Sequence, residues 1–265
     1  MFREVKKHIR LIGRYFMFNL SALVEYRSSF LIQVFGMALN NAAFVFFWWA
    51  LFDKIGMDIA GYGFSDVMFL WAVTSTAYGV ANIFFCNARR ISQLVMTGEL
   101  DTYLLQPKNP LINAISARMS ASAWGDFGYG IVLLAIMGVS AKTWGIFALA
   151  SITGALLMTA IIVTGHSLTL YFGNMEAVGN MMWEFSITFS IYPEGIFKGA
   201  VKTLIMTVVP IGFISQVPMR LVQSFRWGTL ALLLGVTLAY CVFAFFLFMR
   251  GLKRYESGNL IVTRM

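Results

Sequence analysis

Long stretches without a charged residue restrict what this chain can fold into. Ser28–Phe52, Val67–Ala88, Thr143–Met175 and Trp227–Met249 contain no Asp, Glu, Lys or Arg. Roughly 20 apolar residues in a helix are enough to cross the hydrocarbon core of a bilayer. With only 12% charged residues in the whole chain, too little polar surface is left to cover a water-soluble globule. The sequence therefore predicts an integral membrane protein.

Two more apolar stretches are each interrupted by a single carboxylate. Met119–Ala141 contains Asp126, and Ala177–Pro193 contains Glu184. Counting these two, we expect an all-α integral membrane protein with six transmembrane helices in one transmembrane domain, residues 1–265.

A seventh apolar stretch, Thr203–Met219, is harder to interpret. Pro210 and Pro218 lie within it, and proline breaks a regular helix. Irregular backbone at membrane depth must be buried in protein or line a cavity. We interpret residues 194–226 as a re-entrant outer helical segment before the last span. The alternatives are an ordinary external loop, or a seventh span that would place the C-terminus outside.

The N-terminal residues 2–20 are expected to form an interfacial amphipathic helix before the first span. Apolar residues recur at helical spacing on one face of it. Basic residues recur at the same spacing on the opposite face: Arg3, Lys7, Arg10 and Arg14. A soluble amphipathic helix or a calmodulin-like target is the alternative.

The Lys and Arg residues predict the orientation. In a six-span chain with both termini in the cytoplasm, 14 of the 20 basic residues face inward, as the positive-inside rule requires. The cytoplasmic parts are then the N-terminal helix, a loop over residues 87–110 and a tail over residues 250–265. The net charge of +8 is therefore attributed to membrane orientation, and no nucleic-acid partner is expected.

The cytoplasmic loop 87–110 carries apolar residues among charges. Its first part, Arg89–Thr97, is expected to be a helix that ends at Gly98, a common residue at helix C-termini. Pro107 and Pro110 are expected to stop the helical structure that follows and lead into the third span. The loop could dock a soluble partner, or it could fold back on the bilayer surface.

Within this loop the chain resembles the permeases of the bacterial type-2 ABC exporter family. The pattern Gly-x-Leu-Asp-x-x-Leu-Leu-x-Pro is formed by Gly98, Leu100, Asp101, Leu104, Leu105 and Pro107. A proline-rich turn before the last span is similar too, with Tyr192–Pro193, Pro210 and Pro218. The short basic tail beginning at Gly251 resembles one bacterial branch of that family.

The resemblance implies a permease in the bacterial inner (plasma) membrane, where it pairs with a second permease subunit, identical or related. It also implies that cytoplasmic ABC ATPase subunits bind ATP and Mg, so that the permease needs no cofactor of its own. The residues expected to couple to the ATPase are Arg89, Arg90, Leu94, Gly98, Leu100, Asp101, Leu104 and Leu105. Such families export lipids, polysaccharide intermediates, drugs and peptides, and the substrate of this chain does not follow.

The chain lacks the motifs of an energy-converting or hydrolytic enzyme. It contains no GxxxxGK[ST], HExxH or GxSxG sequence, so neither a catalytic nor a metal site is expected. Ionisable residues within spans are costly, and Asp126, His166 and Glu184 are candidates for a translocation path. Their alternative role is hydrogen bonding that fixes helix packing.

Two other functions remain open at this point. One is an ATP-independent membrane scaffold that binds a partner through the same loop. The other is a proton-coupled secondary transporter that uses Asp126 and Glu184, although the internal repeats common in such transporters are not found.

Overall fold

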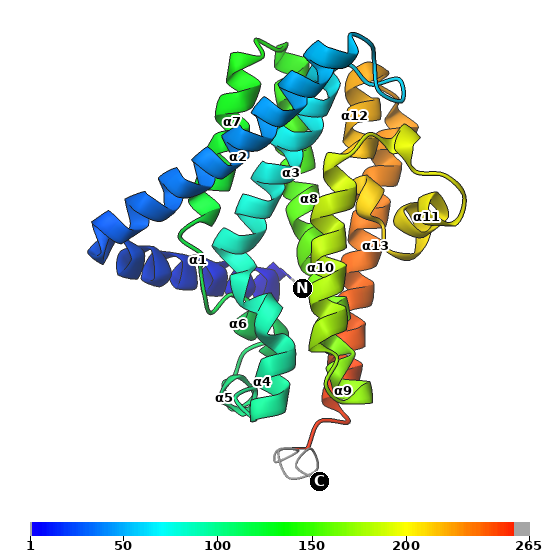
Figure 1. The fold of residues 1–265 in the computed structure, drawn as a ribbon. Helices are drawn as coiled ribbons and strands as arrows, with labels where there is room; N and C mark the ends of the chain where they lie inside the picture. Colours follow the sequence, from blue (N-terminus) through cyan, green and yellow to red (C-terminus); the bar gives the residue numbers. More distant parts are fainter. Residues whose placement is uncertain (1, 257–265) are drawn as a thin grey trace.

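The computed structural model describes residues 2–256, and every regular element in that range is a helix (Figure 1). Four helical segments are long and apolar enough to cross a membrane. They are α2 (Arg27–Ile55), the run from α3 into α4 (Phe64–Thr97), the run from α8 into α9 (Ala141–Phe172) and α13 (Trp227–Leu252). The all-α prediction is confirmed.

The other two expected spans form shorter helices, α7 (Ala123–Ile136) and α10 (Glu176–Ile191). At 1.5 Å per residue they extend about 21 and about 24 Å, less than the hydrocarbon thickness of about 30 Å. Length alone therefore identifies four spans in the described chain, against the six expected.

Helices α3 (Phe64–Phe85) and α8 (Ala141–Ser167) form the centre of the bundle. In the α3 segment 83% of the span window is buried, against 6% in α2 and 17% in α13. Helix α3 packs against α7 and α8, while α13 packs against the outer side of α8. Helix α2 leans away from the bundle towards its junction with α1, so most of its surface has no protein partner (Figure 1).

Small residues bring α3 and α7 into close contact. A Cβ atom added to Gly130 of α7 would lie 2.5 Å from the carbonyl oxygen of Ala72 in α3, and one added to Gly79 would lie 2.5 Å from the backbone nitrogen of Phe127. Between membrane helices, van der Waals contact at such small residues supplies much of the association energy.

We expect Gly130→Ala to destabilise the bundle, because the extra methyl group meets backbone atoms that cannot move aside. Overpacking of this kind costs about 1–3 kcal/mol, which should lower the midpoint of thermal unfolding in detergent by several degrees. Gly128→Ala is the matched control, since Gly128 lies on the same helix with nothing within 4 Å of an added Cβ. An equal loss in both variants would contradict the close packing.

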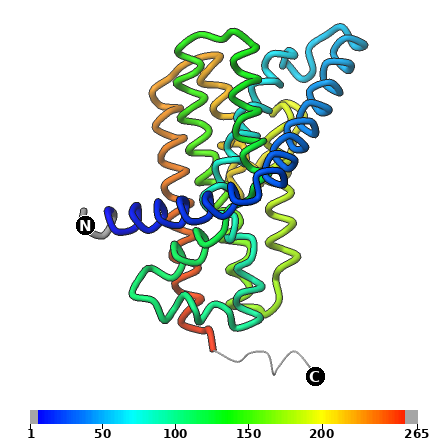
Figure 2. The backbone as a smooth tube through the Cα atoms, turned by 90° about the vertical axis from the view of Figure 1, so that its left-hand side faces the viewer, coloured from blue at the N-terminus to red at the C-terminus, as the bar shows by residue number. Residues whose placement is uncertain are grey.

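Helix α1 (Phe2–Glu25) runs across the bundle at a steep angle to the long helices (Figure 2). It is five residues longer than expected, because the helical backbone continues to Glu25 and breaks only at Tyr26. The tyrosine Tyr15 fixes the helix to the bundle by donating a hydrogen bond to Asn113 Oδ1 at 2.8 Å.

The loop 87–110 extends the helical segment that begins with α3. A 3₁₀ turn, η1 (Cys86–Arg90), connects α3 to α4 (Ile91–Thr97). Gly98 ends α4 with φ +76°, which confirms the expected helix end. The short helix α5 (Asp101–Leu104) follows.

The expectation that Pro110 stops a helix is wrong, because Pro110 begins α6 (Pro110–Ile115). Asn109 precedes it, and its side chain accepts a hydrogen bond from the Ile112 N–H at 3.1 Å. Proline fits the first position of a helix, where no N–H partner is needed.

Residues 194–226 fold as two helical arms that meet near Pro210. The first arm comprises η2 (Glu194–Ile196), α11 (Gly199–Thr203) and the π-helical turn η3 (Leu204–Val208). The second comprises η4 (Ile211–Phe213) and α12 (Gln216–Gln223), whose first turn contains Pro218. Of the expected tail, residues 257–265 lie outside the described part of the chain.

Glu194 holds the two arms together. Its carboxylate accepts hydrogen bonds from Arg220 of α12, with the Nε atom at 2.9 Å, and pairs with Lys202 of α11 at 2.9 Å. Burial alone would raise the pKa of Glu194, but the bonds from Arg220 and Lys202 outweigh burial and lower it below its ordinary value of 4.5.

We expect Glu194→Gln to lower the thermal midpoint at pH 7, where the lost ion pairs are fully formed. Because the folded-state pKa is lowered, their stabilisation is complete above about pH 4.5 and is lost as the pH falls through the folded-state pKa. The difference in thermal midpoint between variant and wild type, here called the gap, should therefore disappear at acidic pH. Glu25→Gln, at an exposed residue, should show no such gap, and a pH-independent gap for Glu194→Gln would contradict the assignment.

Candidate functional site

The loop 87–110 divides its leucines between an inner and an outer side. Leu94 and Leu100 are fully buried and pack into the main apolar core of the bundle. Leu105, by contrast, is 87% exposed, and Leu104 is also exposed. The loop therefore presents an apolar pair on a backbone that the buried leucines hold in place.

Charged residues connect the two sides of the turn at Gly98 and contact the C-terminal end of the described chain. Arg90 pairs with Glu99 across the Gly98 turn at 3.6 Å. The pKa of Tyr255 is raised to about 12, first by burial and then by the neighbouring carboxylate of Asp101. The C-terminal end of the described chain thus packs beside the motif, a proximity that residues 154 positions apart in sequence do not reveal.

Arg89 lies away from this outer surface. Its guanidinium sits 5.1 Å from the centre of the Trp183 ring, a cation–π contact with helix α10. It also lines an internal cavity of about 300 Å³. Of the eight residues expected to couple to an ATPase, Leu94 and Leu100 are thus buried in the core, and Arg89, whose side chain is exposed, contacts α10.

The same cavity brings together two of the three candidate path residues, Asp126 of α7 and Glu184 of α10. Asn41 of α2 donates a hydrogen bond from Nδ2 to Asp126 Oδ1 at 2.8 Å. The second carboxylate oxygen of Asp126 is buried, and no described residue bonds to it. The cavity thus combines two carboxylates with one guanidinium, from three different helical segments.

His166 does not line that cavity. It is fully buried in α8, and its Nδ1 lies 2.8 Å from the Ser92 hydroxyl of α4. Thr169 donates a second hydrogen bond to Ser92 at 2.8 Å, and Thr169 itself accepts from the Met175 N–H at 3.2 Å. This chain of hydrogen bonds fixes helix α4 to α8 and to the start of α10.

The sequence reasoning missed Asn41 and Ser92, the two polar side chains that hold these ionisable residues. A polar residue in an apolar span was the available signal, and Asn41 sits in the middle of the first charge-free stretch. Among the described residues, no group of three or more His, Cys, Asp or Glu side chains could hold a metal ion.

The class of protein follows from a match to a known family. A family model described as ABC-2 family transporter protein matches residues 38–258. The chain belongs to the ABC-2 transporter family. No curated protein and no solved structure matches significantly.

Membership makes the chain an ABC-2 type permease, the membrane transport component of an ABC transporter and not its ATPase. The match covers both the loop with the exposed leucine pair and the cavity with Asp126 and Glu184. The match begins at residue 38, within α2, so helix α1 lies outside the matched range.

Proposed function

We propose that this ABC-2 permease is the membrane-spanning subunit of an exporter driven by separate cytoplasmic ATPase subunits, which dock on α4 and α5. The observation that carries the proposal is the exposed apolar pair Leu104 and Leu105 on a loop that the buried Leu94 and Leu100 hold in place. Exposed leucines on a rigid support suit a protein partner, because apolar contact is the main source of binding energy and little ordering is needed.

The connections of the loop support a mechanical role. Helix α4 continues α3 through η1, and its Ser92 bonds to His166 of α8. Displacement of α4 would therefore act directly on the two most buried helices of the bundle. ATP binding by the partner would favour one of two arrangements of these helices, as any ligand that distinguishes two states does.

Six spans and two cytoplasmic termini complete the proposed topology. Helices α7 and α10 would serve as the third and fifth spans. Because they are shorter than the hydrocarbon core, the bilayer would thin locally around them. Helices α4 and α5 and the end of α13 gather at one end of the bundle, while α1 crosses the bundle nearer its middle (Figure 1). The end with α4 and α5 would face the cytoplasm of a bacterial inner membrane, together with the basic helix α1.

A second permease subunit would cover α2. This helix exposes a row of apolar side chains and is the least buried of the four span-length segments. The cavity with Asp126 lies beside α2, since Asn40 and Asn41 of that helix line it. Pairing through α2 would thus place two such cavities near the subunit boundary, where the proposed export path opens.

Leu105→Asp should abolish co-purification of a cytoplasmic ABC ATPase that binds the wild-type permease, when the two are co-expressed. A carboxylate in a desolvated apolar contact costs several kcal/mol, enough for a loss of more than about 100-fold in affinity. Met57→Asp is the control, because Met57 is 68% exposed in the loop at the opposite end of the bundle. Full binding by Leu105→Asp would exclude docking at α5.

Cysteine cross-linking tests the pairing of subunits. In a background with Cys86 and Cys241 replaced by serine, Phe35→Cys on α2 should form a disulfide-linked dimer in native membranes. Leu238→Cys on α13 is the control, with a similar exposure of 67% against 71% for Phe35. Cross-linking at position 238 but not at 35 would move the interface to α13.

A further inference from the structure

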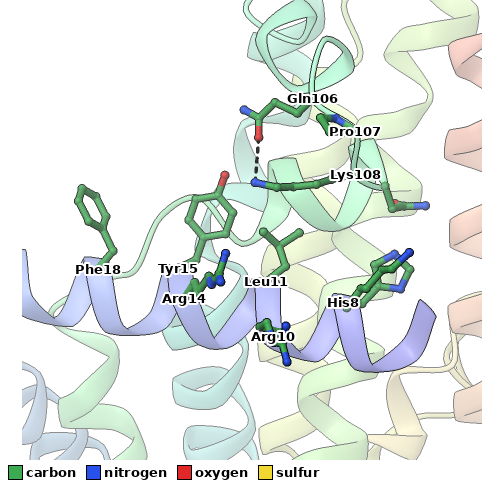
Figure 3. A pocket seen from close by; sticks show the side chains of 11 residues that line it. His8, Arg10, Leu11, Arg14, Tyr15, Phe18, Gln106, Pro107 and Lys108 are labelled. Carbon is green, nitrogen blue, oxygen red and sulfur yellow. Dashed lines mark hydrogen bonds between the residues drawn. The ribbon is translucent and has the colours of Figure 1, made fainter. Parts of the chain in front are cut away.

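A basic pocket lies between helix α1 and residues 106–109, the stretch between α5 and α6 (Figure 3). Its volume is about 850 Å³, within the range of small-molecule sites. One wall is α1 and the other is the stretch 106–109 between α5 and α6. The lining residues are Lys7, His8, Arg10, Leu11, Arg14, Tyr15, Phe18, Gln106, Pro107, Lys108 and Asn109.

Positive charge dominates this lining. Arg10, Arg14 and Lys108 carry it, together with Lys7, and none of the lining residues is a carboxylate. Lys108 donates to Gln106 Oε1 at 3.1 Å, which uses one of the three N–H groups of its ammonium. Because no carboxylate lines the pocket, these cations repel each other, and an anion that enters is attracted strongly.

Both walls of the pocket are fixed in place. The Tyr15 hydroxyl donates to Asn113 of α6 at 2.8 Å, and Asn109 caps that helix. Figure 3 shows Tyr15 and Leu11 of α1 facing the segment with Gln106 and Lys108. The pocket therefore needs little rearrangement to accept a ligand.

Apolar side chains adjoin the charges on α1. Leu11 is buried and Phe18 is 72% exposed among the pocket's lining residues, and α1 also exposes Ile9 and Met17. An acidic segment of a soluble protein would leave these apolar groups in water. A phospholipid would cover them with its acyl chains while its headgroup occupied the basic space.

We propose that this pocket binds the phosphate of an anionic phospholipid headgroup, and that the bound lipid joins α1 to residues 106–109. Phosphate on a cationic pocket at the cytoplasmic end of membrane helices is a recurring form of lipid recognition. The site is distinct from the proposed ATPase dock and from the cavity with Asp126, so it stands even if the proposed ATPase coupling fails.

The test uses the full-length permease, purified in a neutral detergent without any ATPase. Its thermal midpoint is measured during titration with dioleoyl phosphatidylglycerol, with dioleoyl phosphatidylcholine as the uncharged comparison. The pocket variant is Arg14→Gln with Lys108→Gln. The matched control is Lys6→Gln with Arg27→Gln, which removes equal charge at exposed residues outside the pocket.

Phosphatidylglycerol should stabilise the wild type and the control, and phosphatidylcholine should not. In the pocket variant the apparent affinity for phosphatidylglycerol should fall at least about tenfold, since each basic residue near a lipid surface contributes about a factor of five. Native mass spectrometry should show the same loss as fewer bound lipids.

Other outcomes overturn the proposal. An equal loss of affinity for phosphatidylglycerol in the pocket variant and the control would attribute binding to the overall positive charge of the protein. Equal stabilisation by both lipids would exclude recognition of the headgroup. Stabilisation by inorganic phosphate alone, to the same extent, would assign a soluble phosphate. The same result with a poly-glutamate peptide would assign an acidic protein segment.

Discussion

Backbone polar groups in a bilayer have no water to bond with, and the rest of this structure depends on that constraint. Long helices satisfy it in α2, α3, α8 and α13. Where the helices break, side chains replace the lost bonds. Gln216 donates at 2.9 Å to the Phe189 carbonyl near the end of α10, four residues before Pro193, which has no N–H. Asn87 of η1 donates to the Ala114 carbonyl of α6 at 2.7 Å. Each break is thus tied to a neighbouring helix and can transmit its movement.

This arrangement explains why a small cytoplasmic loop can act on a large apolar bundle. The loop has its own exposed leucines, yet its helix α4 extends α3 and is bonded to α8 through Ser92 and His166. His166 thereby belongs with the connection between loop and bundle, while Asp126 and Glu184 belong with the cavity. The three ionisable residues within spans serve two different parts of one proposed transport cycle.

Much of the fold could be predicted from the sequence, because absence of charge and glycine at a helix end act locally. The four long spans and the end of α4 at Gly98 are of this kind. The site was less accessible, since Asn41 meets Asp126 and Glu194 meets Arg220 only after distant helices pack. Leu100 also shows the limit, because motif position alone cannot distinguish a residue that faces a partner from one that faces the core.

Photocross-linking from position 105 tests the central claim most directly. A benzophenone amino acid replaces Leu105 at the tip of the loop, or Ile136 at the opposite end of the bundle, in cells that co-express a cytoplasmic ABC ATPase that binds the wild-type permease. Both residues are exposed, so both variants should fold. A cross-link to the ATPase from position 105 and none from position 136 is the result we expect. Cross-links from position 105 only to lipid, or to an unrelated protein, would contradict the assignment of the loop as the ATPase dock.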